Sequence, residues 1–288
     1  MQLFISWCEG IEDNKNVLNA IKNSKIIDGI ETSNLDNTLE KIQNSGLKVS
    51  IHNPFREHGL GLGDLNLKDS MEKTPEISLV SNKSDPDSVG FHLTGKKDFS
   101  KNRDKVIAKI LENLEFMKTE ISKNILFECR VLGDWHKNSE YKEITDFLTS
   151  HIAVEKILKH SNADFLFDVS HFIVSRFNSN RFNNKDTNFN QELDKFLYSC
   201  TGRIKQLHVN VPFYDDVNGY RDFHDIFRDN HQSKLVKEIL KKTLKSISKL
   251  TRENLFVTLE MDAKVSLKEF PKVMIEQARY FRKLFVCA

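Results

Sequence analysis

Short apolar segments of strand length alternate with longer amphipathic segments along the whole 288-residue chain. Most of the short segments are near-continuous apolar runs, as expected for parallel strands that are buried on both faces. Because helical crossovers join parallel strands with one handedness, this alternation predicts an α/β fold. The eight predicted strands are 3–7, 26–32, 47–52, 88–93, 124–129, 165–170, 204–209 and 255–261.

Helical spacing of apolar residues fills most of the intervals between these strands. Eight strands in fewer than 300 residues predict a single (β/α)8 TIM-barrel domain over residues 1–288. A doubly wound open sheet is the alternative, but no glycine-rich nucleotide-binding motif follows the first strand. The predicted helices are 14–23, 36–44, 101–121, 151–160, 191–198, 233–250 and a last one that opens with a capping box at 266–269.

Two long segments, 53–87 and 172–190, interrupt the alternation and show no convincing full-length helix. Loops of this length inside a compact domain are often binding loops or lids. Both follow predicted strands, so in a barrel they are expected to lie over the catalytic face.

Composition excludes several classes of protein. Lys and Arg total 43 against 41 Asp and Glu, so the near-balanced charge of +2 gives no reason to expect strong non-specific nucleic-acid binding. No apolar run approaches the roughly 18 residues of a membrane span, and no basic leader precedes the first strand. The four cysteines form no CxxC pair, which argues against a disulfide framework or a thiolate zinc site. A cytoplasmic protein without a membrane partner is expected.

Six successive predicted strand ends carry a histidine or a carboxylate, and the loop after the seventh strand adds two more such residues. Charged groups are costly to bury unless they are paired or bind a metal, so this ring predicts a metal cluster at the barrel mouth. Nitrogen and oxygen donors suit iron, zinc or manganese, and nine of them suffice for two or three divalent ions. The predicted ligands are His52, His92, Glu128, Asp168, His171, His208, Asp222, His224 and Glu260.

This ordered set resembles the metal-ligand set of the xylose-isomerase-like TIM barrels, of which two branches are relevant. Endonuclease IV is a three-zinc enzyme that cuts DNA at abasic sites. The multinuclear non-heme iron-dependent oxidative enzymes (the DUF692 group) modify peptides, often at cysteine. The segments His52-Asn-Pro-Phe55 and His208-Val-Asn210 resemble endonuclease IV, whereas Asp168 to Asn178 and Glu260-Met-Asp262 resemble the iron enzymes.

The chain departs from both branches at two points. Glu128 is followed by Cys129 and Arg130, where both branches usually carry Asn. The Gly-His pair that the iron enzymes carry after the equivalent of His208 is missing, and Val209 follows instead. The resemblance is therefore specific for the superfamily, and it leaves the branch open.

The resemblance implies, as the leading hypothesis, an enzyme with two or three irons that oxidatively modifies a peptide or a small thiol substrate. Members of that branch commonly work with a partner protein that delivers the peptide. Under this hypothesis the site residues divide into two groups. Glu128, Asp168 and Glu260 are assigned catalytic roles, and Phe55, Arg176, Asn178 and Asn210 are assigned to substrate binding.

Three alternatives stay open. The first is an endonuclease IV-like, metal-dependent phosphodiester hydrolase acting on DNA, in which Phe55 and Arg176 would contact bases and phosphates. The second is a sugar isomerase or epimerase, with which Glu31 at the end of the second strand is compatible. Such enzymes usually need fewer ligands, so the extra histidines count against this alternative. The third is a metal-binding module without catalytic activity.

Overall fold

Eight parallel strands close into a barrel in the computed structural model, which describes residues 1–6, 15–33, 37–54, 60–72, 86–94, 99–121, 124–261 and 269–285. Around the barrel the strands follow the order β1-β10-β7-β6-β5-β4-β3-β2, and every neighbouring pair is parallel. This closure confirms the prediction of a (β/α)8 barrel. The strands are β1 (Gln2–Ser6), β2 (Gly29–Thr32), β3 (Lys48–His52), β4 (Ser88–His92), β5 (Ile125–Glu128), β6 (Asp164–Asp168), β7 (Ile204–Val209) and β10 (Phe256–Leu259).

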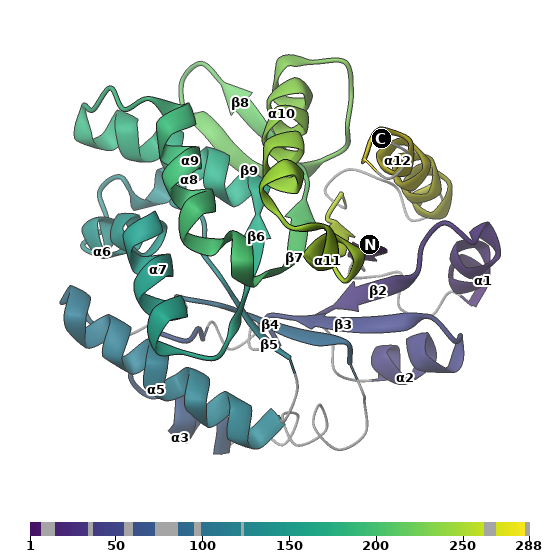
Figure 1. The fold of residues 1–288 in the computed structure, drawn as a ribbon, viewed down its shortest axis with the longest axis horizontal. Helices are drawn as coiled ribbons and strands as arrows, with labels where there is room; N and C mark the ends of the chain where they lie inside the picture. Colours follow the sequence, from purple (N-terminus) through teal and green to yellow (C-terminus); the bar gives the residue numbers. More distant parts are fainter. Residues whose placement is uncertain are drawn as a thin grey trace.

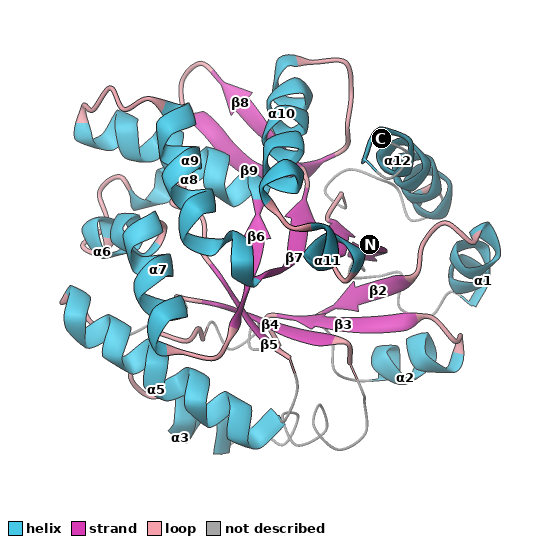
Figure 2. Ribbon diagram, viewed as in Figure 1, coloured by secondary structure: helices cyan, strands magenta, loops and turns pink. Residues whose placement is uncertain are grey.

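Helices surround the barrel, as Figures 1 and 2 show. None of the helices that the structure describes is long and apolar enough to cross a membrane. The described helices are α1 (Lys15–Ser24), α2 (Asn37–Asn44), α3 (Leu67–Glu72), α5 (Arg103–Ile121), α6 (Lys142–Leu148), α7 (His151–His160), α8 (Val169–Asn183), α9 (Phe189–Cys200), α10 (His231–Ser246), α11 (Lys249–Glu253) and α12 (Phe270–Phe285).

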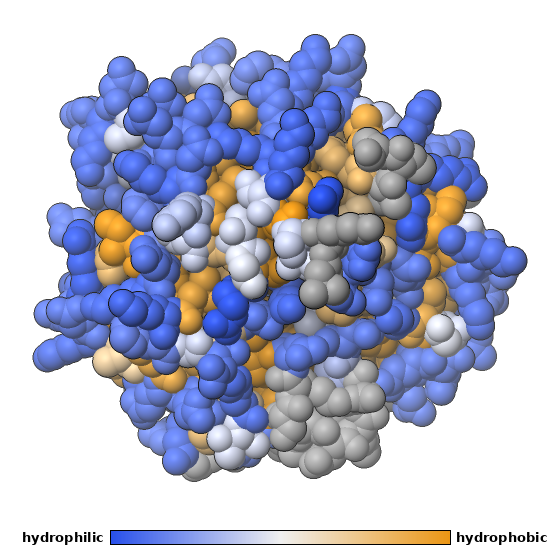
Figure 3. Space-filling model, in the orientation of Figure 1, coloured by the Kyte–Doolittle hydropathy of each residue, from blue (hydrophilic) through white to orange (hydrophobic). Residues whose placement is uncertain are grey.

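The core lies between the barrel and this helical layer. Along α5, Val106, Ile110 and Leu114 are buried at helical spacing, which gives the helix one apolar stripe. Buried side chains of this size each contribute on the order of 1.5–3 kcal/mol relative to exposed ones. Figure 3 shows hydrophilic residues over most of one face, with apolar residues visible in the gaps between helices.

The strand register brings the ends of neighbouring strands to the same height. His92 on β4 is the register partner of Glu128 on β5, and Asp168 on β6 is the partner of His208 on β7. Because successive side chains on a strand point to opposite faces, this register turns the four side chains toward the same barrel mouth.

The prediction that 172–190 forms a loop is wrong. Helix α8 occupies Val169–Asn183, and α9 begins at Phe189. Most of α8 is buried, including Phe172 and Ile173, and so are polar residues such as Ser175. A helix buried around most of its circumference shows no amphipathic stripe, which explains why its sequence gives no helical signal.

The other long segment, 53–87, is described only in part. Within it, α3 is helical, and the stretch before α3 lies along the end of β4, where Leu62 N donates to His92 O at 2.9 Å. Phe55 and the stretch 73–85 lie outside the described residues, as does Ser266 of the predicted capping box.

An antiparallel hairpin follows β7, where sequence reasoning expected a loop. It consists of β8 (Val211–Asp215) and β9 (Gly219–Asp225). Its second strand carries Asp222 and His224, so the hairpin brings two predicted ligands to the barrel mouth.

Candidate metal centre

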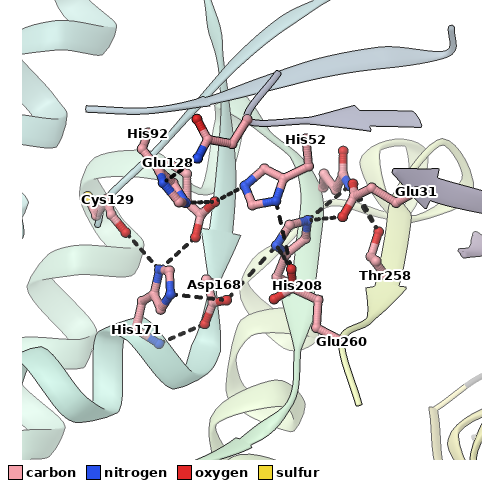
Figure 4. Close-up of polar contacts among 12 residues, drawn as sticks. Glu31, His52, His92, Glu128, Cys129, Asp168, His171, His208, Thr258 and Glu260 are labelled. Carbon is pink, nitrogen blue, oxygen red and sulfur yellow. Dashed lines mark hydrogen bonds and ion pairs between the residues drawn. The ribbon is translucent and has the colours of Figure 1, made fainter. Parts of the chain in front are cut away.

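Glu128 lies between His52, His92 and His171 (Figure 4). Its Oε2 atom is 2.6 Å from His52 Nε2 and 3.3 Å from His92 Nε2. Its Oε1 atom is 2.7 Å from His171 Nδ1. Because each oxygen faces a different set of imidazoles, the carboxylate is placed to bridge two metal positions.

The amide of Asn53 fixes the orientation of His92. His92 Nδ1 lies 3.2 Å from the Asn53 amide, while His92 Nε2 is buried and makes no hydrogen bond. Asn53 Oδ1 also has no hydrogen-bond partner, so rotating this amide by 180° lets the oxygen accept from Nδ1–H. His92 would then present a bare Nε2 toward Glu128, as a metal ligand must.

A second group of donors forms around His208. Its Nδ1 atom is buried without a hydrogen bond, 3.2 Å from Glu260 Oε1 and 4.0 Å from Asp168 Oδ2. The opposite ring nitrogen, Nε2, lies 2.8 Å from Glu31 Oε1. Four of these side chains, His52, His208, Glu31 and Glu260, each offer one ligand atom within 4.8 Å of the others.

Asp168 ends β6 and caps α8 at the same time. Its Oδ1 atom accepts a hydrogen bond of 2.7 Å from the backbone N–H of His171, the normal contact of an N-cap residue. This cap explains the spacing Asp168-x-x-His171, because the third residue after the cap returns to the same side of the helix start. Sequence reasoning placed the pair on a strand and a loop, whereas it lies on a strand and a helix.

The hairpin adds two side chains beside His171. His171 Nε2 lies 3.2 Å from Asp222 Oδ2, and His224 Nε2 lies 3.5 Å from the same oxygen. Ser170 Oγ donates to Asp222 Oδ1 at 2.8 Å, which leaves Oδ2 facing the histidines. His171 Nδ1 lies 3.0 Å from the Cys129 carbonyl, so an N–H there leaves Nε2 free to bind a metal.

The donor set fits divalent metal ions. Three buried atoms that point into the ring, His92 Nε2, Glu128 Oε1 and His208 Nδ1, have no hydrogen-bond partner. Each of them instead faces another donor of the ring, at 3.3 Å for His92 and Glu128, 2.7 Å for Glu128 and His171, and 3.2 Å for His208 and Glu260. Candidate ligand groups occur at His52 with His92 and Glu128, at Glu128 with Asp168 and His171, and around His208. The residues therefore could bind several metal ions.

Burial and neighbouring charges set the protonation of this ring. Burial lowers the pKa of His92 to about 4, so this imidazole is neutral at pH 7. Burial opposes the charged form of Glu128 and Asp222, yet the surrounding imidazoles hold the pKa of both carboxyl groups well below the usual range. Burial raises the pKa of Asp168 to about 7, against the charge of His171. Neutral imidazole and ionised carboxylate are the forms that bind metals.

The residues assigned to substrate binding lie in different places. Asn210 is buried among the ligands, and its amide donates to Glu260 Oε2 at 3.4 Å. Asn178 donates to the backbone oxygen of Leu132 at 2.9 Å. The guanidinium of Arg176 is directed to Asp146 at 3.5 Å, within the helical layer. Phe55 lies outside the described residues.

Sequence reasoning left Glu31 and Asn53 out of the predicted centre. Glu31 ends the second strand, so the rule that found the other ligands already pointed to it. Asn53 directly follows His52 and adopts a left-handed backbone with φ of 47°, a conformation that asparagine tolerates better than most residues. Burial raises the pKa of the Cys129 thiol to about 12, and its Sγ donates to the Leu148 backbone oxygen at 3.4 Å.

Solved structures share this architecture. A D-psicose 3-epimerase from Clostridium cellulolyticum H10, crystallised with D-tagatose, matches with a TM-score of 0.60 and 9% identity over 99% of each chain. A putative xylose isomerase from Rhodospirillum rubrum matches with a TM-score of 0.60 and 8% identity, over 98% of this chain and 99% of that chain. The chain has the xylose-isomerase-like (β/α)8 barrel fold.

A third match is an AP endonuclease of family 2 from Brucella melitensis, with a TM-score of 0.57 and 11% identity over 97% of this chain and 99% of that chain. No protein-family profile and no curated protein sequence matches the chain. At these identities the matches establish the fold alone. None of the three is described as an iron-dependent oxidative enzyme, so that function stays a prediction.

Proposed function

We propose that the protein is a metal-dependent phosphodiester hydrolase that acts on DNA, as endonuclease IV does. The observation that carries the proposal is that the hairpin places Asp222 between His171 and His224, at 3.2 and 3.5 Å from their Nε2 atoms. Two donor groups that meet at Glu128 would suffice for a simpler metalloenzyme. The hairpin adds ligands that do not come from the barrel strands. An isomerase-type site would not require them.

The connection between the groups supports phosphoryl chemistry. Glu128 faces donors of two groups, and Asp168 Oδ2 lies 4.0 Å from both His171 Nε2 and His208 Nδ1. Carboxylates shared in this way would hold more than one cation. Divalent ions bound there would supply a nucleophile at neutral pH and stabilise charge on a phosphodiester.

The chain's own residues prepare the site for this substrate. The four carboxyl groups of Glu128, Asp168, Asp222 and Glu260 would, when ionised, offset the charge of several cations. Asn210 crosses between two of them, since its amide lies 3.5 Å from Asp168 Oδ2 and 3.4 Å from Glu260 Oε2. The amide thereby holds these two carboxylates in place with donors that carry no charge.

The test uses the full chain, purified without metal and then reconstituted with zinc. We expect it to cut a DNA duplex that carries one tetrahydrofuran abasic-site analogue, and to cut the matched undamaged duplex far more slowly. Asp222→Asn keeps the size of the side chain but removes the shared charge, so it should abolish cleavage while the thermal unfolding temperature stays near that of the wild type. Failure of the zinc-loaded protein to cut the damaged duplex would overturn the proposal.

The iron-dependent oxidation of a peptide or small thiol is the competing candidate. The all-nitrogen-and-oxygen donor set favours it as much as it favours hydrolysis, because iron accepts the same ligands as zinc here. The two functions differ in what they consume. Iron-loaded protein that takes up dioxygen in the presence of a cysteine-containing peptide, and that leaves the damaged duplex intact, would support oxidation. If the zinc-loaded protein cuts the damaged duplex equally well with and without dioxygen, the oxidative function is excluded.

A further inference from the structure

A row of buried polar side chains lies inside the barrel directly beneath the metal-ligand ring. Its members come from strands β2, β3, β4, β7 and β10, and all are buried. The register places three of them in one row, because Glu31 pairs with Ser50 and Ser50 pairs with Ser88. We name this group the polar layer: Glu31, Ser50, Ser88, Gln206 and Thr258.

Hydrogen bonds connect the whole polar layer. Ser50 Oγ donates to Glu31 Oε2 at 3.1 Å and lies 2.9 Å from Ser88 Oγ. Ser88 Oγ donates to Gln206 Oε1 at 3.0 Å, and the Gln206 amide donates to Glu31 Oε2 and to Thr258 Oγ1. Ser50, Gln206 and Thr258 all donate to the same oxygen of Glu31, Oε2. The carboxylate is therefore anchored from below through Oε2.

The other oxygen of Glu31 points up toward the ring. Glu31 Oε1 is buried, has no other polar partner, and lies 2.8 Å from His208 Nε2. The Gln206 amide nitrogen is farther from the same ring nitrogen, at 3.3 Å, and it is itself a donor. An N–H on His208 Nε2 can therefore be accepted only by Glu31 among these neighbours.

We infer that Glu31 is a positioning residue for the metal centre, which holds the proton of His208 on Nε2 and so presents Nδ1 as the metal-binding atom. His208 Nδ1 faces Glu260 and Asp168 and has no hydrogen bond, which is the environment this assignment requires. A carboxylate that accepts the distal N–H of a ligating histidine fixes both its tautomer and the orientation of its ring. The inference rests on metal binding by His208, which is part of the proposed function.

The same geometry argues against Glu31 as a metal ligand. Its Oε2 is occupied by donors of the polar layer, and the imidazole of His208 stands between its Oε1 and the carboxylates of Glu260 and Asp168. A metal on Oε1 would require His208 Nε2 to lose the proton that this inference places there. The role of Glu31 is thus exerted through His208.

The first test measures metal affinity by competition with a chromophoric zinc chelator. Glu31→Gln keeps the shape of the side chain, and we expect zinc binding to weaken about 10–100-fold at one site only. Ser88→Ala is the matched control, because it removes a hydroxyl group from the same layer without touching Glu31 or His208. We expect Ser88→Ala to change zinc affinity less than twofold while lowering stability.

If both variants lose zinc affinity equally, Glu31 has only a structural role and the inference is overturned. If the wild type binds no zinc at all, the proposed function fails instead, so the two failures are distinguishable.

The second test needs no variant. Long-range proton–nitrogen NMR spectra of the zinc-loaded wild type report which ring nitrogen of each histidine carries the proton. We expect the proton of His208 on Nε2 and zinc on Nδ1. Zinc on Nε2 of His208 would overturn the inference and would make Glu31 a member of the ligand set.

Discussion

The ligands on the barrel strands and those on the hairpin are held in different ways. Glu128 and His208 are fully buried side chains on strands with parallel neighbours on both sides. Asp222 and His224 lie on a two-stranded hairpin outside the barrel, with 16% and 31% of their side chains exposed. The barrel ligands depend on the fold itself, whereas the hairpin ligands depend on one local element. A metal centre built in this way has a rigid part and an adjustable part.

The largest effect is expected from Glu128→Gln, which alters the rigid part at the carboxylate shared by two donor groups. A neutral amide in place of the shared carboxylate should remove at least two metal equivalents. It should also lower cleavage of the damaged duplex more than about 100-fold, because mutating a mere hydrogen-bond partner of a metal ligand already lowers activity up to about 100-fold. Metal analysis after dialysis measures the first effect. Glu140→Gln, at an exposed ion pair with Lys101, is the control and should leave both quantities unchanged. Full metal content in Glu128→Gln would contradict the bridging role.

An intermediate effect is expected from His224→Ala, which alters only the hairpin. The variant should lose about one metal equivalent and keep the others, because the barrel groups do not use this imidazole. Stability without metal should stay within about 0.5 kcal/mol of the wild type, as for most partly exposed positions. His151→Ala, on α7 and 4.0 Å from Glu192, serves as the matched histidine control. Loss of every metal in His224→Ala would show that the centre is one cooperative unit and would erase the distinction between its two parts.

The smallest effect is expected from Gly219→Ala, at the turn of the hairpin. Gly219 has a φ of 77°, a left-handed conformation that costs an alanine about 1 kcal/mol. We expect zinc affinity to fall a few-fold in the hairpin group and to stay constant in the barrel groups. Gly202→Ala is the control, since an added Cβ there meets nothing within 4 Å. Equal effects of the two substitutions would mean that the backbone of the hairpin does not position its ligands.

The barrel, and the gathering of most of the proposed ligands at its mouth, could be predicted from the sequence, because both follow from simple periodicities. Apolar runs mark strands that are buried on both faces. A charged residue at the end of such a run is costly to bury within the core and is therefore expected at the barrel mouth. His52, His92 and Glu128 were identified by this rule, and the structure brings all three together.

What could not be predicted depends on packing between elements. Helix α8 is buried nearly all round, so the segment has no polar face to reveal it. Arg176 lies on this helix, which explains why a residue expected at a substrate loop is instead directed to Asp146. Glu31 was noticed only as compatible with an isomerase, because its role depends on which nitrogen of His208 it meets, and that information exists only in three dimensions.

The two carboxylate oxygens of Asp168 make different contacts. Oδ1 holds the first turn of α8 through His171 N, and only Oδ2 is left for His208 and the ring. Losing a helix cap costs about 0.5–2 kcal/mol on its own. A substitution that removes both oxygens therefore affects the start of α8 and the proposed metal centre together.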